Sequence, residues 1–181
     1  MQYENFILKC GKIEIRNLKM KYLDDFHAYA SQKEVGPQAG WKPHKTIKQS
    51  KSILKDFIES KLEYGIYLED KLIGLIGVYE DDYLFDKPEF EGKSGVEIGY
   101  SLNKNYWGRG IMTDVVKCFA NHLINDLDYD YISCSCFVDN KRSLRVIEKS
   151  GFKFFAEHFF VNYDGNKKPC YYYYIENFKE G

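Results

Sequence analysis

Strands and helices alternate through the second half of the chain, and this order constrains the fold more than any other feature. Apolar spacing there predicts, in order, a strand over 96–102, a helix over 110–127, a strand over 131–138, a helix over 140–150 and strands over 152–161 and 169–176. A helix between two consecutive strands lets those strands run parallel in one sheet. Asp164-Gly165 signals a hairpin between the last two strands. The second half therefore predicts an α/β arrangement around a mixed sheet.

The first half adds an antiparallel hairpin and two more helices. Its expected elements are a strand over 12–18, a helix over 22–30, a helix that begins at Thr46 or Ser50, and a hairpin of the strands 66–68 and 72–79. Glu69-Asp70 supplies the turn of this hairpin. No repeat or linker divides the sequence, so we expect a single domain over residues 1–181.

The charge balance excludes some classes of partner. Lys and Arg number 26 and Asp and Glu 27, which gives a formal net charge of −1. This balance argues against a nucleic acid or a membrane surface held by bulk charge. The longest apolar run, 72–79, is far shorter than the roughly 18 residues of a membrane helix. Residues 1–5 show no basic stretch before an apolar core, so we expect no signal peptide and a cytoplasmic protein.

The cysteines suggest a reducing compartment. There are five, at Cys10, Cys118, Cys134, Cys136 and Cys170. An odd number without a visible secretory signal fits reduced thiols better than a disulfide framework. Cys134 and Cys136 share one face of a strand, but no second pair or nearby His accompanies them, so we expect no metal site. We interpret all five as buried apolar residues or bystanders.

The turn before the long helix is the most informative segment. Gly108 and Gly110 can adopt backbone conformations that a Cβ forbids, and they let N–H groups approach a ligand closely. The first turn of the following helix presents free N–H groups and a partial positive charge. Arg109 and Lys104 lie near enough to add charge. The segment predicts a diphosphate-binding turn, and the alternative is a tight strand-to-helix turn without a ligand.

The strand over 96–102 has two different faces. Glu97, Gly99 and Ser101 point one way, and the apolar residues point the other way. If this strand is internal, Glu97 lies on a covered face beside a glycine that clears space. A buried, unpaired carboxylate is costly, and it indicates a raised pKa or a functional role. The alternative is a solvent-facing Glu97 on a half-exposed strand.

The helix over 140–150 has a clear start and stop. Asp139 or Asn140 can cap its N-terminus, and Gly151 can end it in a Schellman-type stop. From the residues alone, Asn140 is a cap and Ser143 a first-turn residue. Only further context gives them a functional role.

Together these segments resemble the GNAT superfamily of N-acetyltransferases, and within it the RimJ/RimL-like enzymes, which acetylate N-terminal amines of ribosomal proteins. The resemblance spans nearly the whole chain and is carried by Glu97-Ile98-Gly99-Tyr100, by Tyr106-Trp107-Gly108-Arg109-Gly110, and by Asn140-Lys141-Arg142-Ser143 with Gly151-Phe152. It implies a single α/β (α+β) domain with a mixed, splayed central sheet of about seven strands flanked by about four helices. The strands at 96–102 and 131–138 are expected to part and admit a cofactor.

The resemblance also implies acetyl-CoA as co-substrate, without a metal. The family's diphosphate motif reads Gln/Arg-x-x-Gly-x-Gly/Ala; Gly108 and Gly110 match its small positions, whereas Asn105 stands where Gln or Arg is usual. The pantetheine arm is expected along the backbone of residues 101–102, bonded by Asn140, with Ser143 near the thioester sulfur. The expected acetyl-CoA contacts are Ser101, Leu102, Trp107, Gly108, Arg109, Gly110, Ile111, Met112, Thr113, Asn140 and Ser143.

The implied reaction is direct attack of an amine on the thioester in a ternary complex. Glu97 is the candidate general base, directly or through one water. Backbone N–H groups around residues 101–102 are expected to stabilise the oxyanion. Ser143 is the first candidate for protonating the departing thiolate, with a tyrosine of 171–174 in reserve.

The acceptor stays open at this point. It is a primary amine, either a protein N-terminus, such as that of a ribosomal protein, or a small molecule such as a polyamine or an amino sugar. The acidic loop 80–91 and His44 are candidates for its rim. The alternative class is a non-catalytic module that senses acyl-CoA. Glu97 distinguishes an enzyme from such a sensor, because a sensor needs no general base. The aromatic residues 159–160 and 171–174 pack the sheet or a contact in a possible homodimer.

Overall fold

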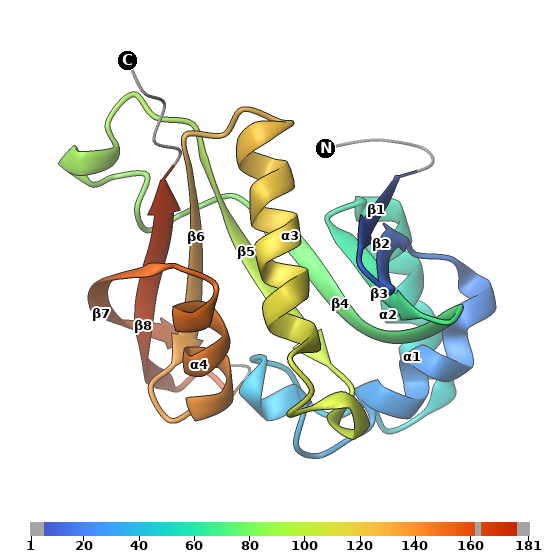
Figure 1. Cartoon of the computed structure of the whole chain (residues 1–181). Coiled ribbons are helices and arrows are strands. Elements are labelled where there is room, and N and C mark those ends of the chain that lie inside the picture. The colour runs from blue at the N-terminus through green and yellow to red at the C-terminus, as the bar shows by residue number, and fades with distance from the viewer. Residues whose placement is uncertain (1–5, 162–163, 177–181) are drawn as a thin grey trace.

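The computed structural model describes residues 6–161 and 164–176, and in them eight strands form one sheet in the order β1-β2-β3-β4-β5-β6-β8-β7 (Figure 1). The strands are β1 (Ile7–Cys10), β2 (Ile13–Asn17), β3 (Glu63–Leu68), β4 (Lys71–Tyr79), β5 (Gly95–Leu102), β6 (Tyr131–Phe137), β7 (Lys153–Val161) and β8 (Lys167–Glu176). Only the neighbours β5 and β6 are parallel in this sheet. The predicted mixed α/β fold is confirmed. The estimate of about seven strands is one short, because the four-residue edge strand β1 carries no clear alternation.

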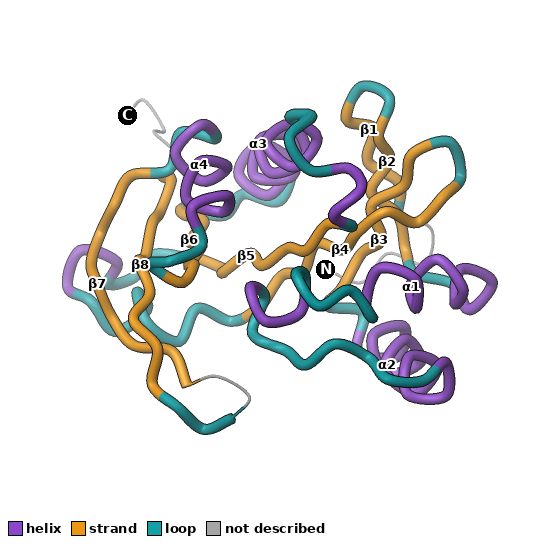
Figure 2. The backbone as a smooth tube through the Cα atoms, turned by 90° about the horizontal axis from the view of Figure 1, so that it is seen from below, coloured by secondary structure: helices purple, strands orange, loops and turns teal. Residues whose placement is uncertain are grey.

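Four α-helices within the described residues cover the two faces of the sheet. They are α1 (Leu23–Ala30), α2 (Ile47–Ser60), α3 (Ile111–Asn125) and α4 (Lys141–Lys149). Single 3₁₀ turns lie at Met20–Tyr22, Gly36–Gln38, Pro88–Phe90 and Lys104–Tyr106. Figure 2 shows α3 and α4 on one side of the sheet, and α1 and α2 on the other. Each pair of helices packs over its own apolar core, one around Phe119 and one around Leu54, and both of these residues are fully buried.

The ends of the elements follow from local chemistry. Thr46 caps α2, since its hydroxyl accepts from the backbone N–H of Gln49 at 3.2 Å. Gly151 has a φ of 90°, and the N–H of Phe152 donates to the Ile147 carbonyl at 3.3 Å, as expected for the predicted stop of α4. The predicted 69–70 turn between β3 and β4 has positive φ at both central residues, which suits the twist of a hairpin.

The strands β5 and β6 separate soon after they meet. Their parallel pairing covers only three register pairs and ends at Glu97 opposite Ser133. β5 stays paired with β4 as far as Leu102 opposite Gly74. The other edge of β5 is therefore open beyond Glu97, and the splay implied by the resemblance is present.

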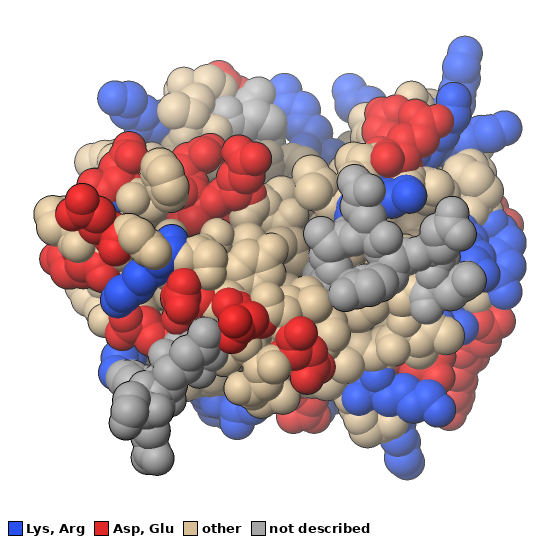
Figure 3. Space-filling model, turned by 90° about the horizontal axis from the view of Figure 1, so that it is seen from above, with Lys and Arg blue, Asp and Glu red and all other residues tan. Residues whose placement is uncertain are grey.

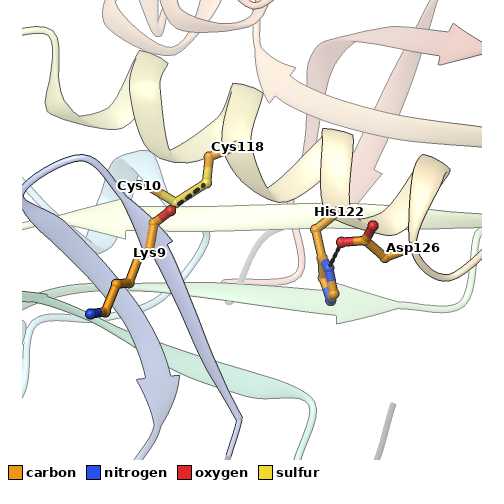
Figure 4. Close-up of a disulfide and its surroundings, with 5 residues drawn as sticks. All are labelled: Lys9, Cys10, Cys118, His122 and Asp126. Carbon is orange, nitrogen blue, oxygen red and sulfur yellow. Dashed lines mark hydrogen bonds and ion pairs between the residues drawn. A yellow bond between two sulfur atoms is a disulfide. The ribbon is translucent and has the colours of Figure 1, made fainter.

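The cysteines differ in part from the expectation. Cys10 of β1 and Cys118 of α3 form a disulfide, with 5.8 Å between their Cα atoms (Figure 4). The prediction that all five thiols are reduced is therefore wrong for this pair. Sequence spacing could not reveal this disulfide, because the two residues are 108 positions apart. They meet only because α3 packs against the edge of the sheet. Cys134, Cys136 and Cys170 are free and buried.

Three remaining expectations concern termini, membranes and aromatic residues. Residues 1–5, on which the signal-peptide expectation rests, lie outside the described residues. No helix in the described part of the chain is long and apolar enough to cross a membrane. Tyr172 and Tyr173 are buried, whereas Phe159 and Phe160 are 56% and 44% exposed on the edge strand β7, so the alternative of packing within the sheet holds for only part of the aromatic set. The homodimer stays a prediction.

Candidate active site

A cavity of about 950 Å³ extends from the gap between β5 and β6 to the layer formed by α1 and α2. Every residue that the sequence singled out as catalytic or as an acetyl-CoA contact lines this cavity, as does His44. Lys104 and the tyrosines 171–174 do not line it. Lys104 instead pairs with Glu34, with 2.8 Å between Nζ and Oε1. The fold therefore joins segments far apart in the sequence around one space.

The glycine turn forms an open cradle at one end of the cavity. Gly108 and Gly110 have φ angles of 74° and 79°, in the left-handed region. A Cβ at either position would meet no atom within 4 Å, so the space above the turn is empty of protein. Gly110 is the N-cap of α3 and offers no side-chain hydrogen bond, which leaves the first N–H groups of the helix free. This geometry suits a diphosphate.

Basic side chains surround the cradle, and most of them were not predicted. Arg109 is held by the Asn105 carbonyl, which accepts from Nη2 at 2.8 Å. Arg142, Arg145 and Lys149 of α4 also line the cavity. These three follow a spacing of three and four residues, which places them on one helical face. This periodicity was the signal in the sequence that could have identified them.

The open edge of β5 offers backbone groups to a ligand. The N–H of Asn103 donates to the Ile73 carbonyl at 2.8 Å. Because bonded residues alternate in an antiparallel ladder, the N–H groups of Tyr100 and Leu102 point into the gap, whereas that of Ser101 points toward β4. The hydroxyl of Ser101 instead lies 3.4 Å from that of Tyr29. Leu102 therefore fits the expected backbone contact, and Ser101 contributes a hydroxyl.

Glu97 lies half-buried in the cavity wall. Its Oε1 accepts a hydrogen bond of 2.6 Å from the hydroxyl of Ser135 on β6. Burial, the largest cause, raises the pKa of Glu97 from 4.5 to about 7, and the negative charges of Asp81 and Asp82 add to the increase. The solvent-facing alternative for Glu97 is not what the structure shows. A carboxyl group with a pKa near neutrality can both accept and release a proton at cellular pH.

Ser143 and Asn140 are held by hydrogen bonds at the start of α4. The hydroxyl oxygens of Ser143 and Tyr100 are 2.8 Å apart. Asn140 caps α4 through a bond of 3.2 Å from the N–H of Ser143, and its Nδ2 donates to the Gln38 carbonyl at 3.2 Å. The cap role of Asn140 is thus present, and its amide retains one more N–H for a ligand. The bond to Tyr100 could not be predicted, because that residue was expected to face only the core.

Carboxylates collect at the end of the cavity opposite the cradle. Glu63, Glu80, Asp82 and Glu97 line it there. From the acidic loop 80–91 only Glu80 and Asp82 reach the cavity, while Asp81 accepts from the backbone N–H of Leu84. Figure 3 shows acidic side chains gathered on the side of the molecule where this loop lies. Glu63 was not predicted, since nothing in the local pattern of β3 distinguishes it.

The part of the chain that the structure describes contains no candidate metal site. No three or more His, Cys, Asp or Glu side chains are grouped there in a way that could bind a metal ion.

Comparisons with known proteins agree with the family resemblance seen in the sequence. Residues 12–153 match the family model described as acetyltransferase (GNAT) domain. The ribosomal-protein-serine acetyltransferase of Escherichia coli strain K12 is 31% identical over 49% of this chain and 45% of its own length, so the chain spans about half of that relative. A GNAT-family acetyltransferase structure from Bacillus anthracis superposes with a TM-score of 0.80 at 20% identity, covering 94% of this chain and 98% of that one. The microcin C7 self-immunity acetyltransferase MccE, solved with acetyl-CoA and AMP, gives 0.74 at 18% identity, over 92% and 93%. At these identities the structures show a shared fold.

Proposed function

Since the chain belongs to the acetyltransferase (GNAT) domain family, we propose that it transfers the acetyl group of acetyl-CoA to a primary amine by direct attack in a ternary complex. One observation carries this proposal: a single cavity contains both an anion cradle and a carboxylate whose pKa is about 7. The cradle fits the donor, and the carboxylate fits a base for the acceptor.

The donor site is built for a long anionic molecule. The free N–H groups at the start of α3, with Arg109 and the basic face of α4, bind the phosphates. The N–H groups of Tyr100 and Leu102 on the open edge of β5 bind the amide groups of the pantetheine arm. The spare N–H of Asn140 adds a further donor. Acetyl-CoA supplies the activated acetyl thioester.

Glu97 removes a proton from the attacking amine. The carboxylate is the correct form for this step, and with a pKa of about 7 it is substantially ionised at neutral pH. The Ser135 hydroxyl orients it. As the N–C bond forms and the C–S bond breaks, the N–H groups of β5 stabilise negative charge on the acetyl oxygen. The amine proton ends on Glu97.

Ser143 gives its hydroxyl proton to the departing sulfur and takes one back from water, while Glu97 returns the amine proton to water, so the net products are the amide and the CoA thiol. Burial raises the pKa of Tyr100 well above its ordinary value, so this tyrosine stays protonated and can donate to the Ser143 oxygen. The hydroxyl hydrogen of Ser143 is then free to point toward the thioester. No tyrosine of 171–174 lines the cavity, which favours Ser143 as the donor.

The test measures release of the CoA thiol from acetyl-CoA with a panel of small amines and peptides, alongside calorimetric titration of CoA. A peptide with the N-terminus of a ribosomal protein belongs in the panel, because the E. coli relative is a ribosomal-protein-serine acetyltransferase. We expect CoA binding and acceptor-dependent thiol release. Binding without release for any amine would favour the acyl-CoA-sensing alternative, and absence of binding would refute both functions.

A further inference from the structure

The charges in the cavity are sorted by sign along its length. Arg109 belongs to the glycine turn, and Arg142 of α4 lies over Trp107 of the same turn, with 4.5 Å between its Cζ and the ring centroid; Arg145 and Lys149 follow on the same face of α4. Glu97 lies near the start of β5, Glu63 is two strands away, and Glu80 and Asp82 follow the end of β4. At a rise of about 3.4 Å per residue, Glu97 lies about 17 Å along β5 from Leu102, where the turn begins. The donor's phosphates therefore account for the basic part, and the acidic part needs a different ligand.

Glu63 and Glu97 lie on the same face of the sheet, with Tyr79 between them. Glu63 of β3 is opposite Gly77 of β4, and Tyr79 is opposite Glu97 of β5. Since side chains alternate along each strand, all three residues point into the same layer. Tyr79 bends back across Gly77, where a Cβ would meet its hydroxyl, and donates a hydrogen bond to Glu63.

The Glu63 carboxylate lacks a cationic partner among residues 6–161 and 164–176. Eight ion pairs are present in that part of the chain, and none includes Glu63 or Glu97. Burial raises the pKa of Glu63, opposed only by the bond from Tyr79. Glu63 is half-buried, and a partly desolvated carboxylate with one protein donor leaves most of its lone pairs without a protein partner. A cationic ligand group would satisfy them.

The neighbouring surface also suits a cation. The half-buried aromatic side chains of Trp41 and Phe57 line the same cavity. Ring faces attract ammonium groups. No Lys or Arg other than the four near the glycine turn lines the cavity within the described residues, so nothing cationic competes for the carboxylates there.

We propose that the acceptor is a molecule with two amino groups, in which Glu97 deprotonates the attacking amine while Glu63 binds the second amine as an ammonium ion. This inference rests on the proposed acetyl transfer and specifies its substrate class. Two strand spacings of about 4.8 Å and a two-residue offset place the Cα atoms of Glu63 and Glu97 about 12 Å apart. Both side chains extend into the space between them, which suits a short aliphatic diamine or the end of a longer oligoamine.

The test compares kcat/KM for α,ω-diamines from propane to octane with the monoamines of the same carbon chain. We expect the wild-type enzyme to prefer the best diamine by about 10- to 100-fold, the range expected for one hydrogen bond to a charged group. Glu63→Gln should lower kcat/KM for the diamine far more than for the monoamine of the same carbon chain, and so remove this preference. Glu63→Asp keeps the charge on a shorter side chain, so it should move the optimum to a longer diamine.

The matched control is Glu59→Gln on the exposed end of α2, which makes the same charge change outside the cavity. It should preserve the diamine preference. Equal kcat/KM for diamines and monoamines, or a Glu63→Gln loss of equal size for both, would overturn the diamine proposal while leaving acetyl transfer intact. Efficient transfer to a peptide N-terminus with no gain for diamines would do the same. Absence of transfer to every amine would refute the proposed function itself.

Discussion

Replacing Glu97 by Gln separates the catalytic value of this carboxyl group from its effect on stability. Gln has nearly the same shape and can still accept the hydrogen bond from Ser135, so the cavity wall should keep its structure. It cannot take up a proton from the amine. General-base catalysis contributes about 100- to 10,000-fold, so we expect kcat to fall by that factor with little change in the KM for acetyl-CoA.

The same variant should be more stable than the wild type, and only above mildly acidic pH. The folded-state pKa of Glu97 is about 7, against an ordinary value of 4.5. Between these values the folded state binds more protons than the unfolded state, so the free energy of unfolding decreases as pH rises through this window. The difference corresponds to at most about 3 kcal/mol, and residual solvent contact reduces it. Glu97→Gln does not lose stability in this way as pH rises. The excess of its free energy of unfolding over that of the wild type should therefore be near zero at pH 4 and greatest above pH 7.

The assays are denaturant unfolding from pH 4 to 8 and kcat/KM over the same range. The wild-type profile should lose activity as pH falls below about 7, since Glu97 becomes protonated. This acid limb should be absent from the residual activity of the variant. Wild-type turnover in Glu97→Gln, or a stability difference that does not grow between pH 4 and pH 8, would refute the assignment.

Four further substitutions test other parts of the structure. Gly110→Val should raise the KM for acetyl-CoA at least about 10-fold in steady-state kinetics, because a side chain would occupy the cradle and resist a φ of 79°. Ser143→Ala should lower kcat about 100-fold; Tyr100→Phe should lower it in the wild type but not in the Ser143→Ala background, as a double-mutant cycle would show. Cys10→Ser breaks the disulfide to Cys118 and should lower the free energy of unfolding by about 2–5 kcal/mol in denaturant titrations.

Each of these variants has a control. Gly92 has a φ of 74° and open space above it but does not line the cavity, so Gly92→Val imposes similar strain and should leave the KM for acetyl-CoA unchanged. Additive effects of Ser143→Ala and Tyr100→Phe would contradict a shared role. Wild-type protein treated with a thiol reductant should match Cys10→Ser, and equal stability with and without reductant would contradict a stabilising disulfide.

Much of the fold was predictable because each local signal agrees with the tertiary structure. The crossover helix fixes β5 and β6 as parallel neighbours, and glycine or polar residues mark the turns. β1 was not predictable, since a four-residue edge strand with Ile7 58% exposed shows no periodic burial. The Cys10–Cys118 disulfide was also missed, because it depends on how α3 packs across the sheet.

The candidate site was predictable where chemistry is local in sequence. The glycine turn and the polar face of β5 carry their own signals, and both lie where they were expected. Glu63 and Ser135 acquire their roles from neighbouring strands, and Tyr100 acquires its role from Ser143 of α4. A strand's sequence does not state which elements lie beside it. For Lys104 the local signal was misleading. Its proximity in sequence to the glycine turn suggested a phosphate contact, but in the folded protein it forms an ion pair with Glu34.

The acidic lining of the cavity has a consequence for product release. An amine that carries positive charge is drawn toward Glu63, Glu80 and Asp82 by their negative field. Acetylation turns that nitrogen into a neutral amide, so the product interacts more weakly with the same wall than the substrate did. Acetylation therefore weakens the electrostatic attraction between the ligand and the site. Added salt screens this attraction, so it should slow binding of the acceptor more than release of the product.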